Sequence, residues 1–229
     1  DRKEREITKK GNYINERLYS IFENINIGKE YEKQNYHYNL IPLNTSEEIF
    51  PTKEIKTDVE KSKEEYKSLL NLIAEDIKRE INQNLILLTS SDKERIYNKL
   101  YYILEKYTTF IPSSTIHYPD ISLFDHLKTT SAIAVCLYEI HKSNEQKDKK
   151  FILLEGDISG IQNFIFQVTE GKEIKKYVSK NLRGRSFYIN VLIDFISKYI
   201  VRRLGLTISN ILYCGGGKFQ LLLPNTHKT

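Results

Sequence analysis

Hydrophobic residues recur at helical spacing through the middle of this chain. Between Asp58 and Leu88 they fall three or four positions apart, which predicts one long amphipathic helix. Ser91 and Glu94 have the spacing of a capping box, so a second helix is expected to begin there and to continue through Tyr107. Each of these helices has an apolar face to bury, and we therefore expect them to form an antiparallel hairpin.

The stretch 1–57 has a different pattern. It is polar and irregular, but the aromatic-rich segments 17–25 and 36–43 alternate enough to predict two strands. We therefore expect this stretch to be a linker with some β structure.

A third helix is expected beyond Pro119. Ser122 with Asp125 has capping spacing, and the helical pattern continues to about His141. The charged run "KSNEQKDKK" that follows is typical of a solvated connector, and we place a domain boundary there. Residues 58–150 are thus expected to form a helical segment that precedes a separate domain over 151–229.

The pattern over 151–229 predicts the first half of a ferredoxin-like domain. "FILLEGD" is a continuous apolar run, typical of a buried central strand, and it ends in a carboxylate. A short helix is expected over 158–166 and a long one over 182–204, followed by a hairpin around a glycine-rich turn. The core face of the long helix is expected to hold Tyr188, Val191, Leu192, Phe195, Ile196 and Tyr199. The order strand, helix, strand, strand begins the β-α-β-β-α-β unit, so we predict an α+β fold.

Composition narrows the class of protein. The chain has 229 residues, and its hydrophobic content of 40% is enough for a packed core. Only two cysteines occur, far apart in sequence, which excludes a disulfide framework and a complete zinc knuckle. No long apolar run or signal peptide is visible, so we expect a soluble cytoplasmic protein without a membrane partner. The chain contains no methionine, and we expect it to be a fragment.

Charge is concentrated in the last third of the chain. The formal net charge is +5, and the residues from Phe151 onward carry 11 Lys and Arg against 5 Asp and Glu. A basic surface of this kind fits a phosphate-bearing partner such as a nucleotide or RNA, although a solvated charged face is the commoner cause.

Two short motifs of the last domain are predicted to meet. In a ferredoxin-like palm the end of the first strand lies beside the turn between the second and third strands. Gly156 and Asp157 should therefore lie near the turn, although about 60 residues separate them. Glycines let backbone amides approach a triphosphate without a Cβ in the way. The nucleotide site predicted here consists of Gly156, Asp157, Ser159, Gly160, Gly215, Gly216, Gly217 and Lys218.

The turn "GGGKF" stands where diguanylate cyclases carry Gly-Gly-Asp-Glu-Phe. Gly217 then replaces the metal-binding Asp, and Lys218 replaces the acid that follows it. A glycine offers no side-chain ligand, and a lysine repels a cation. We therefore predict a degenerate palm that holds a nucleotide, with Lys218 neutralising phosphates, and that has no catalytic or metal-binding residue of its own.

Several motifs in order resemble the large signature subunit of type III-A, Csm-type, CRISPR effector complexes. They are "KYTTFIPSSTIHYPDISLFDHLKTTSAIAVCLY", "GDISGIQNFIF", "LRGRSFYI" and "CGGGKFQLLLPN". The resemblance implies an RNA-guided antiviral complex with two activities, HD-domain cleavage of single-stranded DNA and synthesis of cyclic oligoadenylate from ATP between two palms. This chain would supply the first, non-catalytic palm and contacts with guide RNA, target RNA and a neighbouring backbone subunit. The second palm and the HD domain are not in this sequence, so Mg²⁺ or Mn²⁺ and both activities are expected only in the complete subunit.

Basic residues near the long helix are candidates for RNA or phosphate contact. Arg183 and Arg185 flank Gly184 at the start of the predicted helix, and plain surface arginines would look the same. The basic loop 172–180 supplies Lys172, Lys175, Lys176 and Lys180, for which a solvated loop is the simpler interpretation. The Asp125-His126 pair is read as part of a helix start rather than as a metal site, because no other histidine has ligand spacing around it.

Two other functions compete with a nucleotide-binding palm. A non-enzymatic RNA-binding or scaffold module can use the same ferredoxin-like fold, but it would need exposed aromatic residues on its strands, where the sequence offers Phe151 and Tyr213. An active diguanylate-type cyclase is opposed by Gly217 and Lys218.

Overall fold

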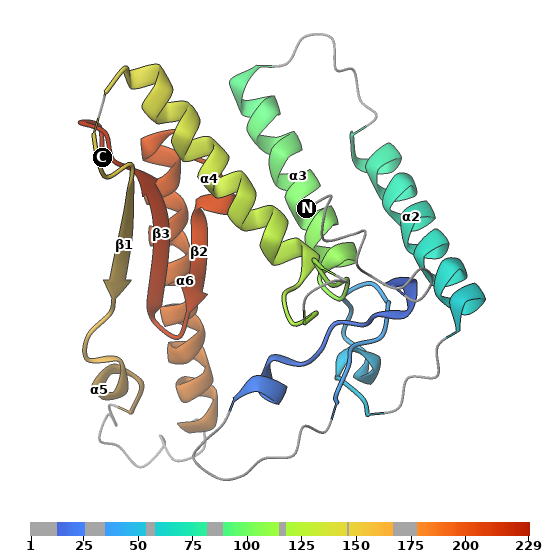
Figure 1. The fold of residues 1–229 in the computed structure, drawn as a ribbon. Helices are drawn as coiled ribbons and strands as arrows, with labels where there is room; N and C mark the ends of the chain where they lie inside the picture. Colours follow the sequence, from blue (N-terminus) through green and yellow to red (C-terminus); the bar gives the residue numbers. More distant parts are fainter. Residues whose placement is uncertain are drawn as a thin grey trace. The chain divides into compact units, whose positions relative to one another are not determined.

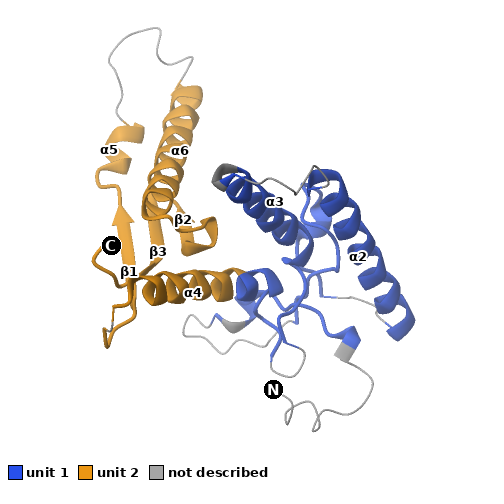
Figure 2. Cartoon of the chain, turned by 90° about the horizontal axis from the view of Figure 1, so that it is seen from above, with its two compact units in different colours: residues 1–127 blue, residues 128–229 orange. Residues whose placement is uncertain are grey.

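The fold is described from a computed structural model, which covers residues 13–25, 35–53, 58–81, 89–114, 118–145, 147–166 and 178–229. The chain divides into two compact units, residues 1–127 and 128–229, which Figure 2 shows in different colours. Each unit has its own cluster of buried hydrophobic side chains. Helices, strands and their labels are drawn in Figure 1.

Unit 1 is built on a helical hairpin. Helix α2 (Val59–Ile81) lies beside α3 (Ser90–Thr108), and Leu69 of α2 is buried with Ile103 and Tyr107 of α3. Lys99 of α3 donates a hydrogen bond to the Glu80 carbonyl oxygen, while Tyr107, two turns later, reaches back to Asp76. The helices therefore run antiparallel, and the predicted hairpin is confirmed.

The N-terminal cap of α3 differs from the prediction. The capping box is formed by Thr89 and Asp92, two residues before the predicted pair Ser91 and Glu94. Aspartate at the third helical position accepts from the Thr89 backbone as glutamate would, so both pairs fit the sequence rule. The predicted end of α2, residues 82–88, lies outside the described residues.

A buried carboxylate joins the two helices of unit 1. The Asp76 carboxylate accepts hydrogen bonds from the Tyr107 hydroxyl at 2.7 Å and from Lys106 Nζ at 3.1 Å. These two donors lower the pKa of Asp76 below its ordinary value. The group thus remains ionised within the helix pair over the neutral range.

The two strands expected in 17–25 and 36–43 are wrong. These segments make only isolated bridges, Tyr19 to His37 and His37 to Thr52, and a 3-10 helix, η2 (Ile21–Asn24), lies inside the first. Two further short 3-10 helices are η1 (Tyr13–Asn15) and η3 (Glu47–Ile49). Alternating aromatic residues predicted strands, but the rings make side-chain contacts outside any sheet, such as the Tyr19–Tyr118 stack with centroids 4.7 Å apart.

Unit 2 contains a three-stranded antiparallel sheet of order β1-β3-β2. Strand β1 is Phe151–Asp157, β2 is Ile211–Gly215 and β3 is Lys218–Pro224. Between β1 and β2 the chain forms α5 (Ile161–Phe166), α6 (Val178–Leu204) and the 3-10 helix η5 (Ile208–Asn210). A strand, a helical crossover and a hairpin whose last strand lies in the middle form the first half of a ferredoxin-like unit, so the predicted fold is confirmed.

The position of β1 in this sheet differs from the prediction. Among the strands that the structure describes, β3 is central and β1 lies at an edge. Alternate residues of β1 are exposed, including Phe151 and Leu153. The continuous apolar run of β1 indicates that both of its faces are apolar. It does not indicate how many strands pair with β1.

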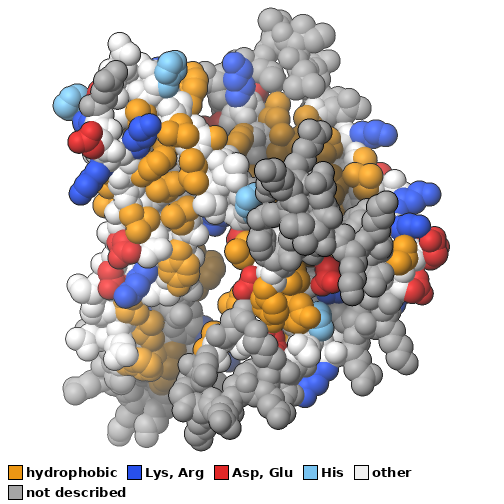
Figure 3. Space-filling model, viewed as in Figure 1, with side chains coloured by type: hydrophobic (Ala, Val, Ile, Leu, Met, Phe, Trp, Pro, Cys, Tyr) orange, Lys and Arg blue, Asp and Glu red, His pale blue; other side chains and the backbone are white. Residues whose placement is uncertain are grey.

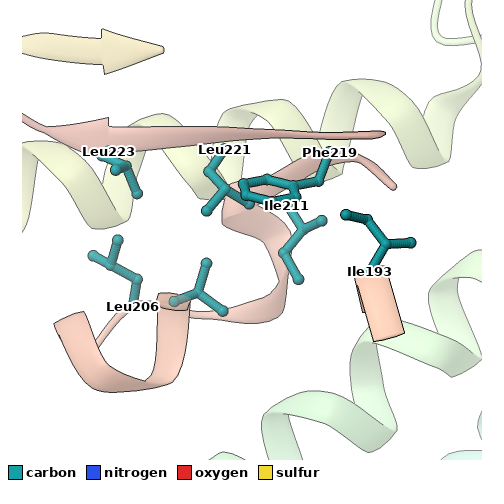
Figure 4. Packing of buried hydrophobic residues seen from close by; sticks show 7 residues of the cluster. Ile193, Leu206, Ile211, Phe219, Leu221 and Leu223 are labelled. Carbon is teal, nitrogen blue, oxygen red and sulfur yellow. The ribbon is translucent and has the colours of Figure 1, made fainter. Parts of the chain in front are cut away.

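The core of unit 2 lies between α6 and one face of the sheet. Phe219, Leu221 and Leu223 point from β3 toward the same side of the strand, where Figure 4 shows them with Ile193, Leu206 and Ile211. Alternation along β3 places these three residues on one face, since successive side chains of a strand point to opposite faces. Alternation therefore explains why these three residues share a face, and the packing of α6 buries that face.

The core face predicted for α6 is largely wrong. The buried residues of α6 are Ile189, Ile193, Ser197 and Val201. Of the predicted residues, Tyr188, Val191, Phe195 and Tyr199 are exposed, while Leu192 and Ile196 are partly buried and Ile196 packs against the core. Both sets recur at helical spacing, so periodicity does not choose between them. The true core face contains a polar residue, Ser197. Its hydroxyl donates a hydrogen bond to the Asp194 carbonyl oxygen at 2.9 Å, so the buried donor is satisfied.

Helix α4 (Leu123–Ser143) confirms the third predicted helix, with Ser122 Oγ accepting a hydrogen bond from the Asp125 N–H at 3.3 Å. From Lys128 onward α4 belongs to unit 2, where Cys136 Sγ and Asn210 Nδ2 both donate to the carbonyl oxygen of Leu222. The division between the two compact units thus falls within α4, between Leu127 and Lys128. A domain boundary at the charged run that follows α4 stays a prediction.

Unit 2 also exposes apolar side chains. Hydrophobic side chains gather over the region of β1 and β3 in Figure 3, and Leu153 is 56% exposed. In the described parts of the chain, no helix combines the length and apolar character that crossing a lipid bilayer requires.

Candidate functional site

The two motifs that sequence analysis predicted to meet are neighbours across the β1–β3 ladder. Asp157, the last residue of β1, is paired in register with Lys218, the first residue of β3. The Lys218 Nζ lies 3.5 Å from Asp157 Oδ2. On its other side Lys218 is paired with Gly215, the last residue of β2. The strand end and the hairpin turn therefore form one continuous surface, as predicted.

Two of the three glycines in the turn have a backbone conformation that favours glycine. Gly216 and Gly217 have φ angles of +58° and +83°, the left-handed region that a two-residue hairpin turn requires at both central positions. Gly215 has no such angle, and a Cβ added there would lie 3.4 Å from the Tyr213 hydroxyl oxygen. The turn therefore explains Gly216 and Gly217, whereas a side chain at position 215 would meet only ordinary contacts with Tyr213.

Gly156 is a glycine because of its cross-strand partner. It is paired with Phe219, whose buried ring occupies the space in which a Cβ on Gly156 would lie. The pair keeps the last residues of β1 close to β3. Asp157 therefore owes its position beside Lys218 partly to the ring of Phe219.

The loop after β1 is held against the turn by a backbone hydrogen bond. The Ile158 N–H donates to the Gly217 carbonyl oxygen at 2.9 Å. Ser159 and Gly160 follow as an exposed turn, with a φ of +74° at Gly160, and α5 begins at Ile161. The short helix begins three residues later than the predicted 158. Asp157 is consequently a strand end, separated from the helix by three residues, and not the residue that adjoins its start.

The electrostatics of the site are those of one exposed ion pair. The side chains of Asp157 and Lys218 are 60% and 64% exposed, so the pair itself contributes little to stability. Among the described residues, no group of three or more His, Cys, Asp or Glu side chains could share a metal ion. A single carboxylate beside an ammonium group does not fit a divalent cation, which requires several oxygen ligands and little positive charge nearby. An anion such as a phosphate group is better matched to Lys218 and the glycine turn.

The two arginines predicted as phosphate contacts lie in the second turn of α6 and just beyond it, because the helix begins at Val178, four residues before the predicted start. Arg185 donates hydrogen bonds to the carbonyl oxygens of Phe164 at 3.1 Å and Ile165 at 3.4 Å, at the end of α5. Arg183 donates to Ser179 Oγ at 3.1 Å. Arg185 thus supports α5 and, through it, the loop next to Asp157; contact of either arginine with RNA or phosphate stays a prediction.

The predicted basic loop is described only at its end. Lys180 lies in the first turn of α6, whereas Lys172, Lys175 and Lys176 lie outside the described residues. Asp125 and His126 lie in the first turn of α4.

Sequence reasoning missed one residue of the site. Ile161, the first residue of α5, lies against Gly217, so that its side chain covers the glycine turn. An apolar residue four positions after a strand end gives no signal of this kind, because its proximity to the turn depends on the path of the loop.

Comparison with known proteins identifies the relatives of this chain. Residues 150–229 match a family model described as Csm1 subunit domain B. The chain is 36% identical over 244 residues to the CRISPR system single-strand-specific deoxyribonuclease Cas10/Csm1 (subtype III-A) of Methanocaldococcus jannaschii, covering 90% of this chain and 28% of that protein. It is 40% identical over 136 residues to the protein of the same name from Thermococcus onnurineus, covering 56% of this chain and 17% of the relative. The chain thus spans about a quarter or less of these relatives.

Solved structures agree with this result. The crystal structure of Csm1 in T. onnurineus superposes with a TM-score of 0.67 and 30% identity, covering 93% of this chain and 26% of that one. A Csm1–Csm4 cassette in complex with one ATP gives a TM-score of 0.67 at 29% identity over the same shares of the two chains.

Proposed function

Because the chain belongs to the Cas10/Csm1 family of type III-A CRISPR systems, of whose members it spans only a part, we propose that unit 2 is an ATP-binding, non-catalytic palm. The pairing of Asp157 with Lys218, beside a turn of two glycines with positive φ, carries this proposal. It supplies one positive charge and a bare backbone turn at the same point of the surface. These are the features that bind a phosphate chain.

Solved relatives support ATP as the ligand. Structures of Csm1–Csm4 cassettes have been determined with one ATP, with AMPPNP, with pppApA and with cA4. All of these ligands are ATP, its analogue or oligoadenylate chains. We infer the same class of ligand for this chain.

Catalysis is assigned to other parts of the complete protein. The described residues form no group of three or more His, Cys, Asp or Glu side chains that could hold a metal ion, so we infer that this palm binds a nucleotide and that catalysis takes place elsewhere. In the complete subunit we expect oligoadenylate synthesis to require a second palm with Mg²⁺ or Mn²⁺. Cleavage of single-stranded DNA, which the names of the relatives state, is assigned to an HD domain outside this sequence.

Partners follow from the same family. Structural relatives form a Csm1–Csm4 subcomplex of the type III-A interference complex, and we propose a neighbouring subunit of that kind here. Guide RNA, target RNA and a cytoplasmic location are proposed as parts of the same assignment. Arg183 and Lys180, on the first turns of α6, are the described residues proposed for RNA contact.

Titration of the 229-residue chain with ATP tests the proposal. We expect Lys218→Glu to weaken ATP binding at least tenfold, about 1.4 kcal/mol, because it replaces the phosphate partner with a like charge. Asp157→Ala should change the affinity by a smaller factor, since it removes the partner that holds Lys218. Lys149→Glu makes the same charge change just before the opposite end of β1 and should leave the affinity within twofold. Unchanged ATP affinity in both site variants would reject the site.

A second candidate function rests on exposed aromatic residues. Tyr213 is 52% exposed and Phe151 is 39% exposed, so strands β1 and β2 each offer one ring, as RNA-binding sheets do. If this chain is an RNA-binding scaffold, Tyr213→Ala weakens binding of single-stranded RNA while ATP binding is undetectable. ATP binding that depends on Lys218 favours the palm.

A further inference from the structure

The space above Gly217 is filled by Ile161. A Cβ added to Gly217 would overlap the terminal methyl group, Cδ1, of Ile161, whereas Cγ1 of the same side chain would remain 3.5 Å away. Cγ2 of Ile189, from α6, would lie at 3.7 Å, an ordinary contact. One methyl group is therefore the principal obstacle to a side chain at position 217.

The backbone of Gly217 does not exclude aspartate by itself. Its φ of +83° lies in the left-handed region, where Asp and Asn occur several-fold more often than other residues with a side chain. Gly217 is the second central residue of the turn, where hairpins favour glycine, so an aspartate there would be strained. The obstacle to an aspartate therefore combines this backbone strain with the side chain that α5 places against the turn.

The backbone around Ile161 is held at two points. The Ile158 N–H to Gly217 carbonyl bond, at 2.9 Å, joins the loop to the turn. Arg185 binds the last carbonyl oxygens of α5 and lies over the Phe164 ring, with its guanidinium carbon 5.9 Å from the centroid. These contacts hold the short helix, so the Ile161 methyl can leave the space above Gly217 only by rotation about its own side-chain bonds.

We propose that Ile161 closes this palm to divalent cations: its terminal methyl occupies the space that a metal-binding carboxylate at position 217 would need, so ATP phosphates are neutralised by Lys218 without a metal ion. The proposal rests on the proposed ATP-binding function. It differs from a simple loss of acidic residues because it predicts that restoring the acid alone does not restore the metal site.

The charge pattern agrees with a metal-free site. Asp157 already has a cationic partner in Lys218, 3.5 Å away, and so does not need a metal ion to neutralise it. When a triphosphate binds, Lys218 has an anion on each side, which resembles the role of a bridging cation. No other carboxylate of the described residues completes a group of three with Asp157.

The first test measures ATP binding with and without metal. The chain is titrated with ATP in millimolar Mg²⁺ and again in excess EDTA, at the same ionic strength. We expect the two dissociation constants to agree within about threefold. ATP binding that is lost in EDTA overturns this inference and leaves the proposed function standing, whereas absence of ATP binding under both conditions overturns the proposed function itself.

The second test removes the obstructing atom. Ile161→Val deletes Cδ1 and leaves Cγ1, so it is the matched variant for this contact. Gly217→Asp is compared in the two backgrounds by the urea midpoint of unfolding. We expect the loss in midpoint caused by Gly217→Asp to be at least halved when Ile161→Val is also present. An equal loss in both backgrounds shows that Ile161 is not the obstacle and overturns the proposal.

The third test measures Mn²⁺ binding, which a change in protein stability alone would not produce. Gly217→Asp with Lys218→Glu restores both acids of the turn, and Mn²⁺ is followed by its electron paramagnetic resonance signal. We expect Mn²⁺ binding only when Ile161→Val is combined with these two changes. Binding in both backgrounds, or in neither, would overturn the assignment of Ile161.

Discussion

The backbone N–H of Ile158 donates to the Gly217 carbonyl oxygen at 2.9 Å, which joins the loop after β1 to the β2–β3 turn. Together with the register pair Asp157–Lys218, it makes the strand end and the turn one structural element. We therefore expect a ligand that contacts Lys218 to meet the loop at Ser159 and Gly160 as well. For the same reason, substitutions in the turn are expected to change the position of the loop.

The Asp157–Lys218 ion pair is expected to matter for binding and not for stability. Both side chains are more than half exposed, and exposed pairs contribute about 0–1 kcal/mol. Asp157→Ala and Lys218→Ala should each change the free energy of unfolding by less than about 1 kcal/mol, measured by urea denaturation followed by circular dichroism. A much larger loss would mean that the pair is structural and that changed ATP affinity reports unfolding.

Gly156→Ala is expected to destabilise unit 2. The added Cβ would overlap the buried ring of Phe219, and overpacking of this kind costs about 1–3 kcal/mol. Gly184→Ala is the matched control, since no atom lies within 4 Å of the added Cβ. Because Gly184 lies within α6, this control should stabilise the protein by about 0.5–1 kcal/mol. Equal effects of the two substitutions in urea denaturation would contradict the close approach of β1 to Phe219.

Tyr107→Phe is expected to destabilise unit 1 in a pH-dependent way. It removes the 2.7 Å hydrogen bond to the Asp76 carboxylate, which is worth about 1.5–3 kcal/mol for a charged acceptor near pH 7. Tyr102→Phe, at an exposed position of the same helix, is the control and should have little effect.

The sign of the pH dependence follows from the pKa of Asp76. The hydrogen bonds from Tyr107 and Lys106 lower this pKa in the folded protein, so the stability they provide is complete above the unfolded value of about 3.9. It is lost as the pH falls through the lower, folded value. The difference in unfolding free energy between wild type and Tyr107→Phe should therefore shrink as the pH is lowered below about 4. A difference that is the same at pH 7 and pH 3 would show that the carboxylate is not the partner that matters.

The buried face of α6 is tested by a pair of substitutions two positions apart. Ile193 is buried against β3, so Ile193→Ala should cost about 2–5 kcal/mol through the cavity it leaves. Phe195 is 63% exposed, and Phe195→Gln should change stability by no more than about 0.5 kcal/mol. Urea denaturation of both variants measures the two losses of stability. If Phe195→Gln destabilised the protein more than Ile193→Ala, the face predicted from periodicity would be the buried one.

The sequence by itself determined the helical hairpin, the third helix, the ferredoxin-like order of unit 2 and the meeting of its two motifs. Each depends on local signals: helical spacing from Asp58 to Tyr107, a capping serine at Ser122, and a turn at Gly216 and Gly217 that requires positive φ. The fold topology then places Asp157 beside Lys218, because strand order fixes which strand ends adjoin.

Only the tertiary structure decided which face of α6 is buried, where α3 is capped and what lies over the glycine turn. Tyr188 and Ile189 both begin a helical stripe of mostly apolar residues, and the packing of α6 on β3 selects the second. Ile161 reaches Gly217 through the path of a loop, and Arg185 reaches the carbonyl oxygens of α5 from another helix. Periodicity records how residues repeat along one element, whereas these contacts depend on how separate elements are placed in space.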